Sequence, residues 1–293
     1  MNYKKKTPGE HIYIFVCYAI IILMCVLTLF PFFYLVAASF SGATAVMRNE
    51  VVLWPVDFTT KAYTVVMKYK GIWMAYANTI FYTVAGTTLS VLMTILAAYP
   101  LSKSRWAWKK PMGLFIVFTM WFSGGMIPFY LNMKNLHLLN TRSGILLYGA
   151  ISAFYVIIFR THFESIPVAL EESAKLEGAN DFQILFKIMV PLSKPIIAAI
   201  ALYYAIDKWN AYFWEMLLLS DENLIPVQVL LQRIVINSQL GQDIAKSLSP
   251  GEATIPNTIK YAAIMITTMP IIVIYPFFQK YFVSGALVGS VKE

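Results

Sequence analysis

The side chains whose types and spacing suggest a chemical role gather in one short polar stretch within an apolar run. Aromatic, amide and charged groups occur there within nine residues: Asp207, Lys208, Trp209, Asn210, Tyr212, Trp214 and Glu215. Sugar rings stack on aromatic faces and amides hydrogen-bond to hydroxyl groups, so the uncharged members suit a path for a hydroxylated solute. The four-residue spacing of Asn210 and Trp214 predicts that both lie on one helix face.

A second interpretation of this stretch stays open. Charges at membrane depth are costly and usually face a bundle interior or a water-filled path. In the alternative, Asp207 and Lys208 lie near the outer interface. Trp209 and Trp214 are then interfacial aromatic residues that contact no solute.

The second candidate stretch is the polar connection 160–194, which is too long for a tight turn. Ser165 is expected to cap a short helix that has Pro167 in its first turn and runs through Glu177. Gly178 then ends the helix, because glycine readily adopts the left-handed conformation found just after helix ends.

A second short helix is expected to follow in the same connection. Asn180 and Gln183 have the spacing of a capping box, and Pro191 is expected to stop the helix. One apolar face is predicted on it, made of Phe182, Leu185, Phe186 and Met189. With small Ser173 and Ala174 nearby, such a surface fits a protein socket better than an anionic lipid surface.

The sequence lacks the common catalytic and metal-binding motifs. It contains no G-x-x-x-x-G-K-[ST], H-E-x-x-H, C-x-x-C or G-x-S-x-G pattern. The three histidines, His11, His137 and His162, fall in different connections or ends, so they predict no shared metal site. We therefore expect no catalytic residue, no metal and no cofactor bound by this chain.

Composition places these stretches in a membrane protein. Of 293 residues, 59% are hydrophobic and 13% are charged, whereas soluble domains have about 25% charged residues. This excludes a soluble enzyme and a disordered chain. The net charge of +8 is attributed to cytoplasmic loops rather than to a nucleic-acid surface.

The charge-poor runs predict an all-α fold with six membrane-spanning helices in a single domain, 1–293. The expected spans are 12–38, 72–101, 111–133, 143–162, 195–219 and 258–280. The connection 103–110 has four basic residues and no acidic one, and the N-terminus carries Lys4, Lys5 and Lys6. By the positive-inside rule both termini are cytoplasmic.

This topology assigns the remaining segments to the two sides of the membrane. The connection 163–193 and the tail 281–293 are cytoplasmic, and the loops 41–70 and 220–256 are external. A helix is expected to start at Thr59 or Thr60. An amphipathic helix is predicted after Pro226, with apolar residues at Val227, Leu230, Leu231, Ile234 and Val235. It either lies on the bilayer surface or docks an outer partner, and spacing favours neither.

An ordered motif within 167–195 resembles a known family. It consists of the contiguous run Pro167–Ala179, which includes Glu171, Glu172, Ser173, Ala174, Glu177 and Gly178, followed by Phe186, Ile188, Pro191 and Pro195. The motif resembles the EAA loop of ABC importer permeases, whose coupling helices sit in a cleft of the ATPase subunit. Ser173 replaces the usual second alanine and Glu177 replaces the common aspartate. The resemblance implies ATPase contacts through Glu171, Glu172, Ser173, Ala174, Glu177, Gly178, Phe182, Phe186 and Pro191.

Further motifs resemble the carbohydrate, maltose-type branch of that family. They are Trp54-Pro55 in the first outer loop, Asn78-Thr79 in the second span, Trp209-Asn210 in the fifth and the tail 279–292. The tail's Gly285, Gly289 and Lys292 are implied to reach the ATPase interface. The resemblance is strongest to the subgroup that imports complex or acidic oligosaccharides.

The resemblance implies a transport subunit and not an enzyme. Its expected partners are a second permease subunit, two ATP-binding subunits, an external solute-binding protein, the bilayer and a carbohydrate. ATP and magnesium would be bound by the partner ATPase, in the inner membrane of a bacterium. The alternatives are an ABC permease for a non-sugar solute, a secondary transporter with no ATPase, and a membrane-embedded enzyme. A secondary transporter would need intramembrane carboxylates or broken helices in repeated halves, and a membrane-embedded enzyme would need a polar catalytic set at one depth; the sequence indicates neither.

Overall fold

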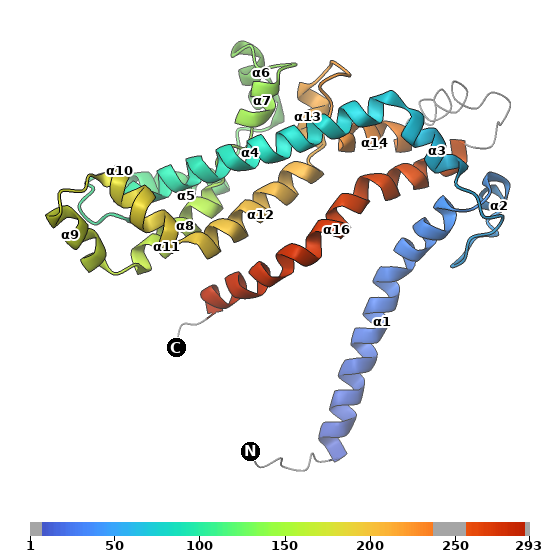
Figure 1. Ribbon diagram of the computed structural model, residues 1–293, viewed down its shortest axis with the longest axis horizontal. Helices are drawn as coiled ribbons and strands as arrows, with labels where there is room; N and C mark the ends of the chain where they lie inside the picture. The colour runs from blue at the N-terminus through green and yellow to red at the C-terminus, as the bar shows by residue number, and fades with distance from the viewer. Residues whose placement is uncertain (1–7, 237–255, 291–293) are drawn as a thin grey trace. The chain divides into compact units, whose positions relative to one another are not determined.

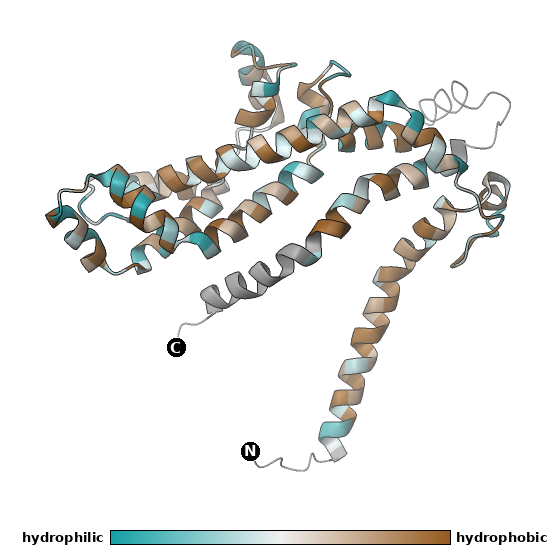
Figure 2. Ribbon diagram, in the orientation of Figure 1, coloured by the Kyte–Doolittle hydropathy of each residue, from teal (hydrophilic) through white to brown (hydrophobic). Residues whose placement is uncertain are grey.

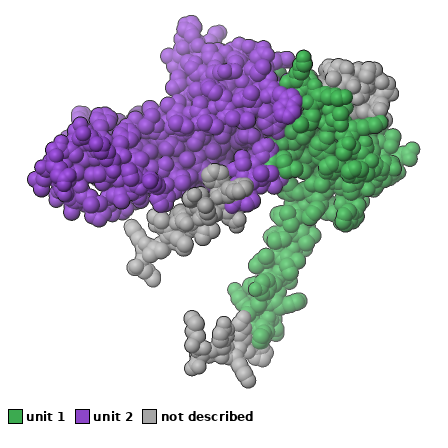
Figure 3. All heavy atoms as spheres, viewed as in Figure 1, with its two compact units in different colours: residues 1–70, 233–269 green, residues 71–232, 270–293 purple. Residues whose placement is uncertain are grey.

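The computed structural model describes residues 8–236 and 256–290, and every regular element in these ranges is a helix (Figure 1). This agrees with the expected all-α class. The chain divides into two compact units (Figure 3): Met1–Lys70 with Arg233–Met269, and Gly71–Gln232 with Pro270–Glu293.

The first unit contains α1 (Pro8–Ser39), α2 (Ala43–Met47) and α3 (Lys61–Lys68). Most of α1 is apolar on every side and exposed (Figure 2), as expected of a helix whose surroundings are lipid. Only its end packs inward, where Ala37 and Ala38 meet Val46 and Val51. The start of α3 directly after Thr60 agrees with the sequence-based expectation.

The longest helix of the second unit is α4 (Lys70–Ser102), at the place of the predicted second span. Its 33 residues extend about 50 Å at 1.5 Å per residue. Small polar side chains, including Ser90 and Thr94, are fully buried along it. The Thr94 hydroxyl lies 2.8 Å from the Tyr204 hydroxyl, which ties α4 to α12 (Lys194–Asn210).

The predicted third span is not one straight helix. It consists of α5 (Lys109–Trp121) and α6 (Met126–Asn135), whose axes differ by 116°. Gly125 lies at the break with φ +88°, a conformation that favours glycine. The hydropathy of this run gives no sign of the turn, because glycine and serine leave the apolar character almost unchanged.

The predicted fourth and fifth spans are also interrupted. The fourth is divided into α7 (Arg142–Leu147) and α8 (Ala153–Ser165), with Gly149 between them at φ +62°. The fifth is divided into α12 and α13 (Phe213–Leu218). Two described helical stretches, Gly9–Ser39 and Lys70–Ser102, are long and apolar enough to cross a membrane unbroken.

The predicted connection 163–193 forms four short helical segments: α9 (Val168–Leu176), α10 (Asp181–Ile184), the π-helical turn η1 (Leu185–Met189) and α11 (Val190–Leu192). Together with α4, α8 and α12 they share one core that includes Tyr99, Phe159, Ala174, Ile184 and Ile200. The short helices are therefore packed onto the bundle, and they also carry both polar and apolar residues that are exposed (Figure 2).

The outer amphipathic helix is α14 (Val227–Ile236). Val227, Leu230 and Ile234 of its apolar face are buried within the protein, whereas Val235 is 41% exposed. The buried part of the face is free neither for the bilayer surface nor for a partner. The rest of the predicted loop, 237–255, lies outside the described residues.

The final helix, α16 (Pro256–Ser290), continues past residue 280, where the sixth span is expected to end. The proposed ATPase-interface residues Gly285 and Gly289 therefore belong to a helix rather than to a separate tail. Lys292 lies outside the described residues.

Candidate functional site

Helix α9 begins at Val168. Pro167 is its N-cap residue and so lies just before the first helical turn, not within it as expected. The expectation that Ser165 caps this helix is wrong. Ser165 is the last residue of α8, and its hydroxyl donates 2.7 Å to the His162 carbonyl of its own helix. Pro167 starts α9 without such a cap because its fixed φ suits a helix start and it has no amide donor to satisfy.

The end of α9 has the hydrogen bonds of a Schellman motif. The backbone amide of Gly178 donates a 2.9 Å hydrogen bond to the Lys175 carbonyl. The backbone amide of Ala179 donates one of the same length to the Ala174 carbonyl. Gly178 has φ +84° and no neighbouring atom where a side chain would begin. The predicted helix-ending glycine is thus confirmed, and backbone conformation rather than space requires it.

The capping box at the start of α10 is also confirmed. The Gln183 amide donates to the Asn180 side chain, and the Asn180 amide donates to the Gln183 side chain, both at 2.9 Å. Pro191 does not stop the helical run, which reaches Leu192. A π-helical turn directly precedes Pro191, and its wider path separates the ring from the carbonyl that it would meet in an α-helix.

The predicted apolar face of this second helix divides into two sets. Leu185 and Met189 are buried in the core, whereas the Phe182 and Phe186 side chains are 69% and 45% exposed. The π-helical turn widens the spacing of residues 185–189, so the four side chains do not form one stripe. Only the two phenylalanines remain available to a partner.

The predicted coupling residues of α9 likewise differ in exposure. Glu172, Ser173 and Glu177 face outward, but Ala174 is buried in the chain's own core. Leu176, which belongs to the motif run, is 91% exposed, and Val168 and Leu170 of the same helix are 65% and 43% exposed. Helix α9 therefore exposes more than one isolated apolar side chain, as is typical of a surface that another protein covers.

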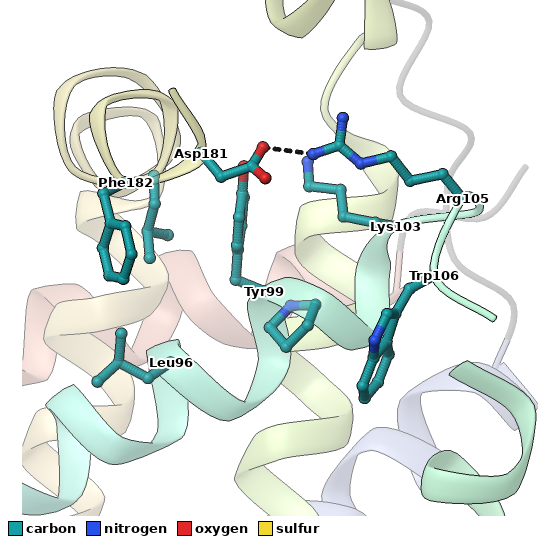
Figure 4. Close-up of a pocket in the computed structure, with 9 residues that line it drawn as sticks. Leu96, Tyr99, Lys103, Arg105, Trp106, Asp181 and Phe182 are labelled. Carbon is teal, nitrogen blue, oxygen red and sulfur yellow. Dashed lines mark hydrogen bonds and ion pairs between the residues drawn. The ribbon is translucent and has the colours of Figure 1, made fainter. Parts of the chain in front are cut away.

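A network of charges attaches α9 and α10 to the segment after α4. Glu171 is paired with Lys103 and Lys175, and Arg105 with Asp181 (Figure 4). Burial by itself would raise the pKa of the Glu171 carboxyl, but hydrogen bonds from the two lysines outweigh it and hold that pKa below its usual range. The carboxylate stays charged at neutral pH.

A pocket of about 460 Å³ adjoins this network, between the end of α4 and α10. Figure 4 shows the Arg105–Asp181 pair beside it. Its lining is mostly apolar and aromatic, with three charged residues: Leu96, Tyr99, Pro100, Lys103, Arg105, Trp106, Asp181, Phe182 and Leu185. The basic connection 103–110 predicts the orientation of the chain but not these ion pairs, because the partners of Lys103 and Arg105 lie far away in sequence.

The predicted solute-path residues are split by a break in the chain. Helix α12 ends at Asn210 and α13 begins at Phe213, so Asn210 and Trp214 do not share a helix face as expected. Tyr212 lies in the break and its side chain is 44% exposed. An interruption of this kind gives access to backbone polar groups that a continuous helix would hide.

The two tryptophans of the stretch have different surroundings. The Trp209 ring centre lies 6.4 Å from that of Tyr76, and its buried indole N–H has no hydrogen-bond partner among the residues that the structure describes. Trp214 packs against Phe129 at 4.6 Å and Tyr148 at 5.5 Å. Trp209 therefore retains a donor for a ligand or water, whereas Trp214 is part of an aromatic cluster.

Lys208 and Glu215 of the stretch face the protein, whereas Asp207 is exposed. The Lys208 ammonium donates 2.8 Å to the Tyr148 carbonyl, and Glu215 is 4% exposed. This placement agrees with a bundle interior rather than with the outer interface for both groups. In the described part of the chain, no group of three or more His, Cys, Asp or Glu residues could hold a metal ion.

At the opposite end of α4, the Asn78-Thr79 pair holds the segment before α14. The Asn78 amide donates to the carbonyls of Asn223 and Ile225, at 2.7 and 3.2 Å. The Thr79 hydroxyl accepts from the Val227 amide at 2.7 Å. The pair is thus a structural link between α4 and the segment before α14.

Comparison with known proteins agrees with this geometry. Residues 69–287 match the family model described as "Binding-protein-dependent transport system inner membrane component". The polygalacturonan/rhamnogalacturonan transport system permease protein YtcP of Bacillus subtilis is 41% identical over 94% of this chain and 96% of its own length. Protein LplC of the same organism is 37% identical over 91% of this chain and 90% of its own.

A solved structure is similar over nearly the whole chain. It is the crystal structure of a bacterial ABC transporter involved in the import of the acidic polysaccharide alginate. The matched chain has a TM-score of 0.90 and 41% identity, covering 96% of this chain and 100% of that chain. Together with the family match, this shows that the chain belongs to the inner membrane components of binding-protein-dependent transport systems.

Proposed function

We propose that this chain is a transmembrane subunit of an ATP-driven, binding-protein-dependent ABC importer that moves oligo- or polysaccharides into a bacterial cell. The similarity to sugar permeases along the full chain supports this function. The observation that carries it is the outward face of α9 and α10, where Leu176 and Phe182 are 91% and 69% exposed. A permease without an ATPase would have no use for this surface.

The chain forms one permease domain with six spans and both termini in the cytoplasm. The spans are α1, α4, α5 with α6, α7 with α8, α12 with α13, and α16. Ion pairs between the connection after α4 and the segment α9–α10 support this topology, because both must then lie on one side of the membrane. The contacts of Asn78 with Asn223 similarly join segments assigned to the outer side.

The chain is a transport subunit that catalyses no chemical reaction. ATP and magnesium are bound by two partner ATPase subunits, whose closure moves α9 and α10 and thereby switches access between the two sides. A second permease subunit completes the path, and an external binding protein delivers the solute. Similarity to transport permeases supports these roles.

The substrate is an acidic oligo- or polysaccharide. Relatives named for polygalacturonan and alginate transport support an acidic substrate. Trp209, with its unpaired indole N–H, and the exposed Asn210 and Tyr212 offer donors and aromatic faces for sugar units.

Purification of the tagged chain from mild detergent, with mass spectrometry of its partners, tests the function. We expect a P-loop ATPase and a second permease to accompany the chain. Ligand screening of the assembled complex with its binding protein should then select uronic-acid oligomers over neutral ones. Recovery of this chain alone, stable and monodisperse, would contradict the proposal and favour a secondary transporter.

A further inference from the structure

Three segments meet at the charge network beside the pocket in Figure 4. Lys103 directly follows the last residue of α4 and is paired with Glu171 of α9. Arg105, two residues later, is paired with Asp181 of α10 and lies 3.7 Å from the Glu171 carboxylate. One short stretch after α4 therefore holds both short helices.

The inner pair of the network is shielded from water. The side chains of Lys103 and Glu171 are 11% and 12% exposed, and the lysine ammonium lies 4.5 Å from the centre of the Tyr99 ring. Salt screens a buried pair much less than an exposed one. This pair therefore fixes the register of α9 against the end of α4.

The outer pair lies at the edge of the packed contact between α10 and α4. Ile184 and Leu185 share a core with Tyr99, and beside that contact is a gap, the pocket of about 460 Å³, that both elements line. The Arg105–Asp181 pair lies beside this gap and connects its two walls. Because these side chains are 48% and 57% exposed, the pair contributes alignment more than stability.

We propose that Lys103 and Arg105 are positioning residues that lock α9 and α10 to the end of α4. A displacement that the ATPase imposes on the short helices is then passed to α4 as the movement of one rigid unit. This inference rests on the proposed function, since it needs an ATPase that moves α9 and α10. It adds residues outside the family motif to the coupling device.

The test uses the complete transporter in proteoliposomes with its loaded binding protein, and measures ATP hydrolysed per oligosaccharide imported. ATP-driven uptake by the wild type first establishes the proposed function. Lys103→Met should then raise the ratio by about fivefold or more, the lower end of typical coupling between sites. Lys109→Met is the matched control, because Lys109 pairs with Glu164 of α8, 2.8 Å away, and not with α9 or α10.

A second set of variants keeps the proposal testable if Lys103→Met does not assemble. Arg105→Gln and Asp181→Asn should each raise the ratio, and the double variant should be no worse than Arg105→Gln alone, because the residues act through each other. The proposal is overturned if the ratio stays at the wild-type value while only the yield of assembled transporter falls. Independent, additive effects of Arg105→Gln and Asp181→Asn would also overturn it.

Discussion

The side-chain amide of Asn78 donates a 2.7 Å hydrogen bond to the backbone carbonyl of Asn223, a residue 145 positions later in the chain. Asn78 is buried, and its own carbonyl accepts from the Arg142 guanidinium at 3.2 Å. One residue of α4 thereby connects the start of α7 with the segment before α14. This end of α4 is held to both segments by side-chain contacts of this kind.

Asn78→Ala should destabilise the protein by about 1–3 kcal/mol, the usual cost of leaving buried polar partners unsatisfied. The thermal midpoint of the detergent-solubilised complex measures the change. Asn223→Ala is the matched control, because Asn78 binds the backbone carbonyl of Asn223, which that substitution retains. Equal losses for both variants would contradict the role given to Asn78.

Substitutions at Gly178 separate backbone strain from charge. Its φ of +84° costs a side chain with a β-carbon about 1–2 kcal/mol, and less for Asn or Asp. We expect Gly178→Asn to retain coupled ATP hydrolysis and Gly178→Asp to lose it, since the two side chains have the same shape. Binding-protein-stimulated ATPase activity is the measurement. Full activity and full uptake of the Asp variant would exclude Gly178 from the ATPase contact.

Replacing the neighbours Ser173 and Ala174 by a bulky residue should affect two different properties, ATPase binding and stability. Ala174→Leu overfills the chain's own core and should lower stability by about 1–3 kcal/mol. Ser173→Leu changes an exposed position, so it should leave stability unchanged but reduce co-purification of the ATPase. Thermal midpoints and ATPase recovery distinguish the two effects. The assignment of Ser173 to the contact fails if ATPase recovery is unaffected.

Replacement of Trp209 tests the solute path. Loss of one hydrogen bond from its indole N–H should raise the KM for uptake by about threefold to tenfold. Trp214→Ala should mainly lower stability, because that ring packs against Phe129 and Tyr148. Initial uptake rates over a range of oligosaccharide concentrations give both constants. An unchanged KM for Trp209→Ala and for Asn210→Ala would remove both from the path.

The Glu171 carboxyl predicts a pH dependence of stability. Its pKa in the folded protein is lowered, so its stabilising effect is present above the unfolded pKa of about 4.3. That effect is lost as pH falls through the lower folded value. The stability difference between wild type and Glu171→Gln should therefore be largest near neutral pH and shrink in acid. A difference that does not change with pH would contradict the ion pairing.

Local signals could be predicted well from the sequence. The glycine that ends α9 and the Asn180–Gln183 capping box depend on residues a few positions apart, and both are found in the structure. The bends could not be predicted in this way. Gly125 lies within an apolar run, and hydropathy does not distinguish a bent path from a straight one.

Ion pairs between residues far apart in the chain also could not be predicted from sequence patterns. Lys103 and Glu171 are 68 positions apart, and Arg105 and Asp181 are 76 apart. Nothing in the local spacing of either segment specifies the other. The basic connection after α4 was therefore used for orientation only, although its side chains hold α9 and α10. The difference in burial between the exposed Phe182 and Phe186 and the buried Leu185 likewise depends on a π-helical turn, which no residue pattern predicted.

Uptake by reconstituted proteoliposomes tests the central claim most directly. The complex is supplied with its loaded binding protein outside and ATP inside, and accumulation of labelled uronic-acid oligosaccharide is measured with and without a protonophore. We expect accumulation that requires hydrolysable ATP and is insensitive to the protonophore. Accumulation that occurs without ATP and collapses with the proton gradient would contradict an ATP-driven importer.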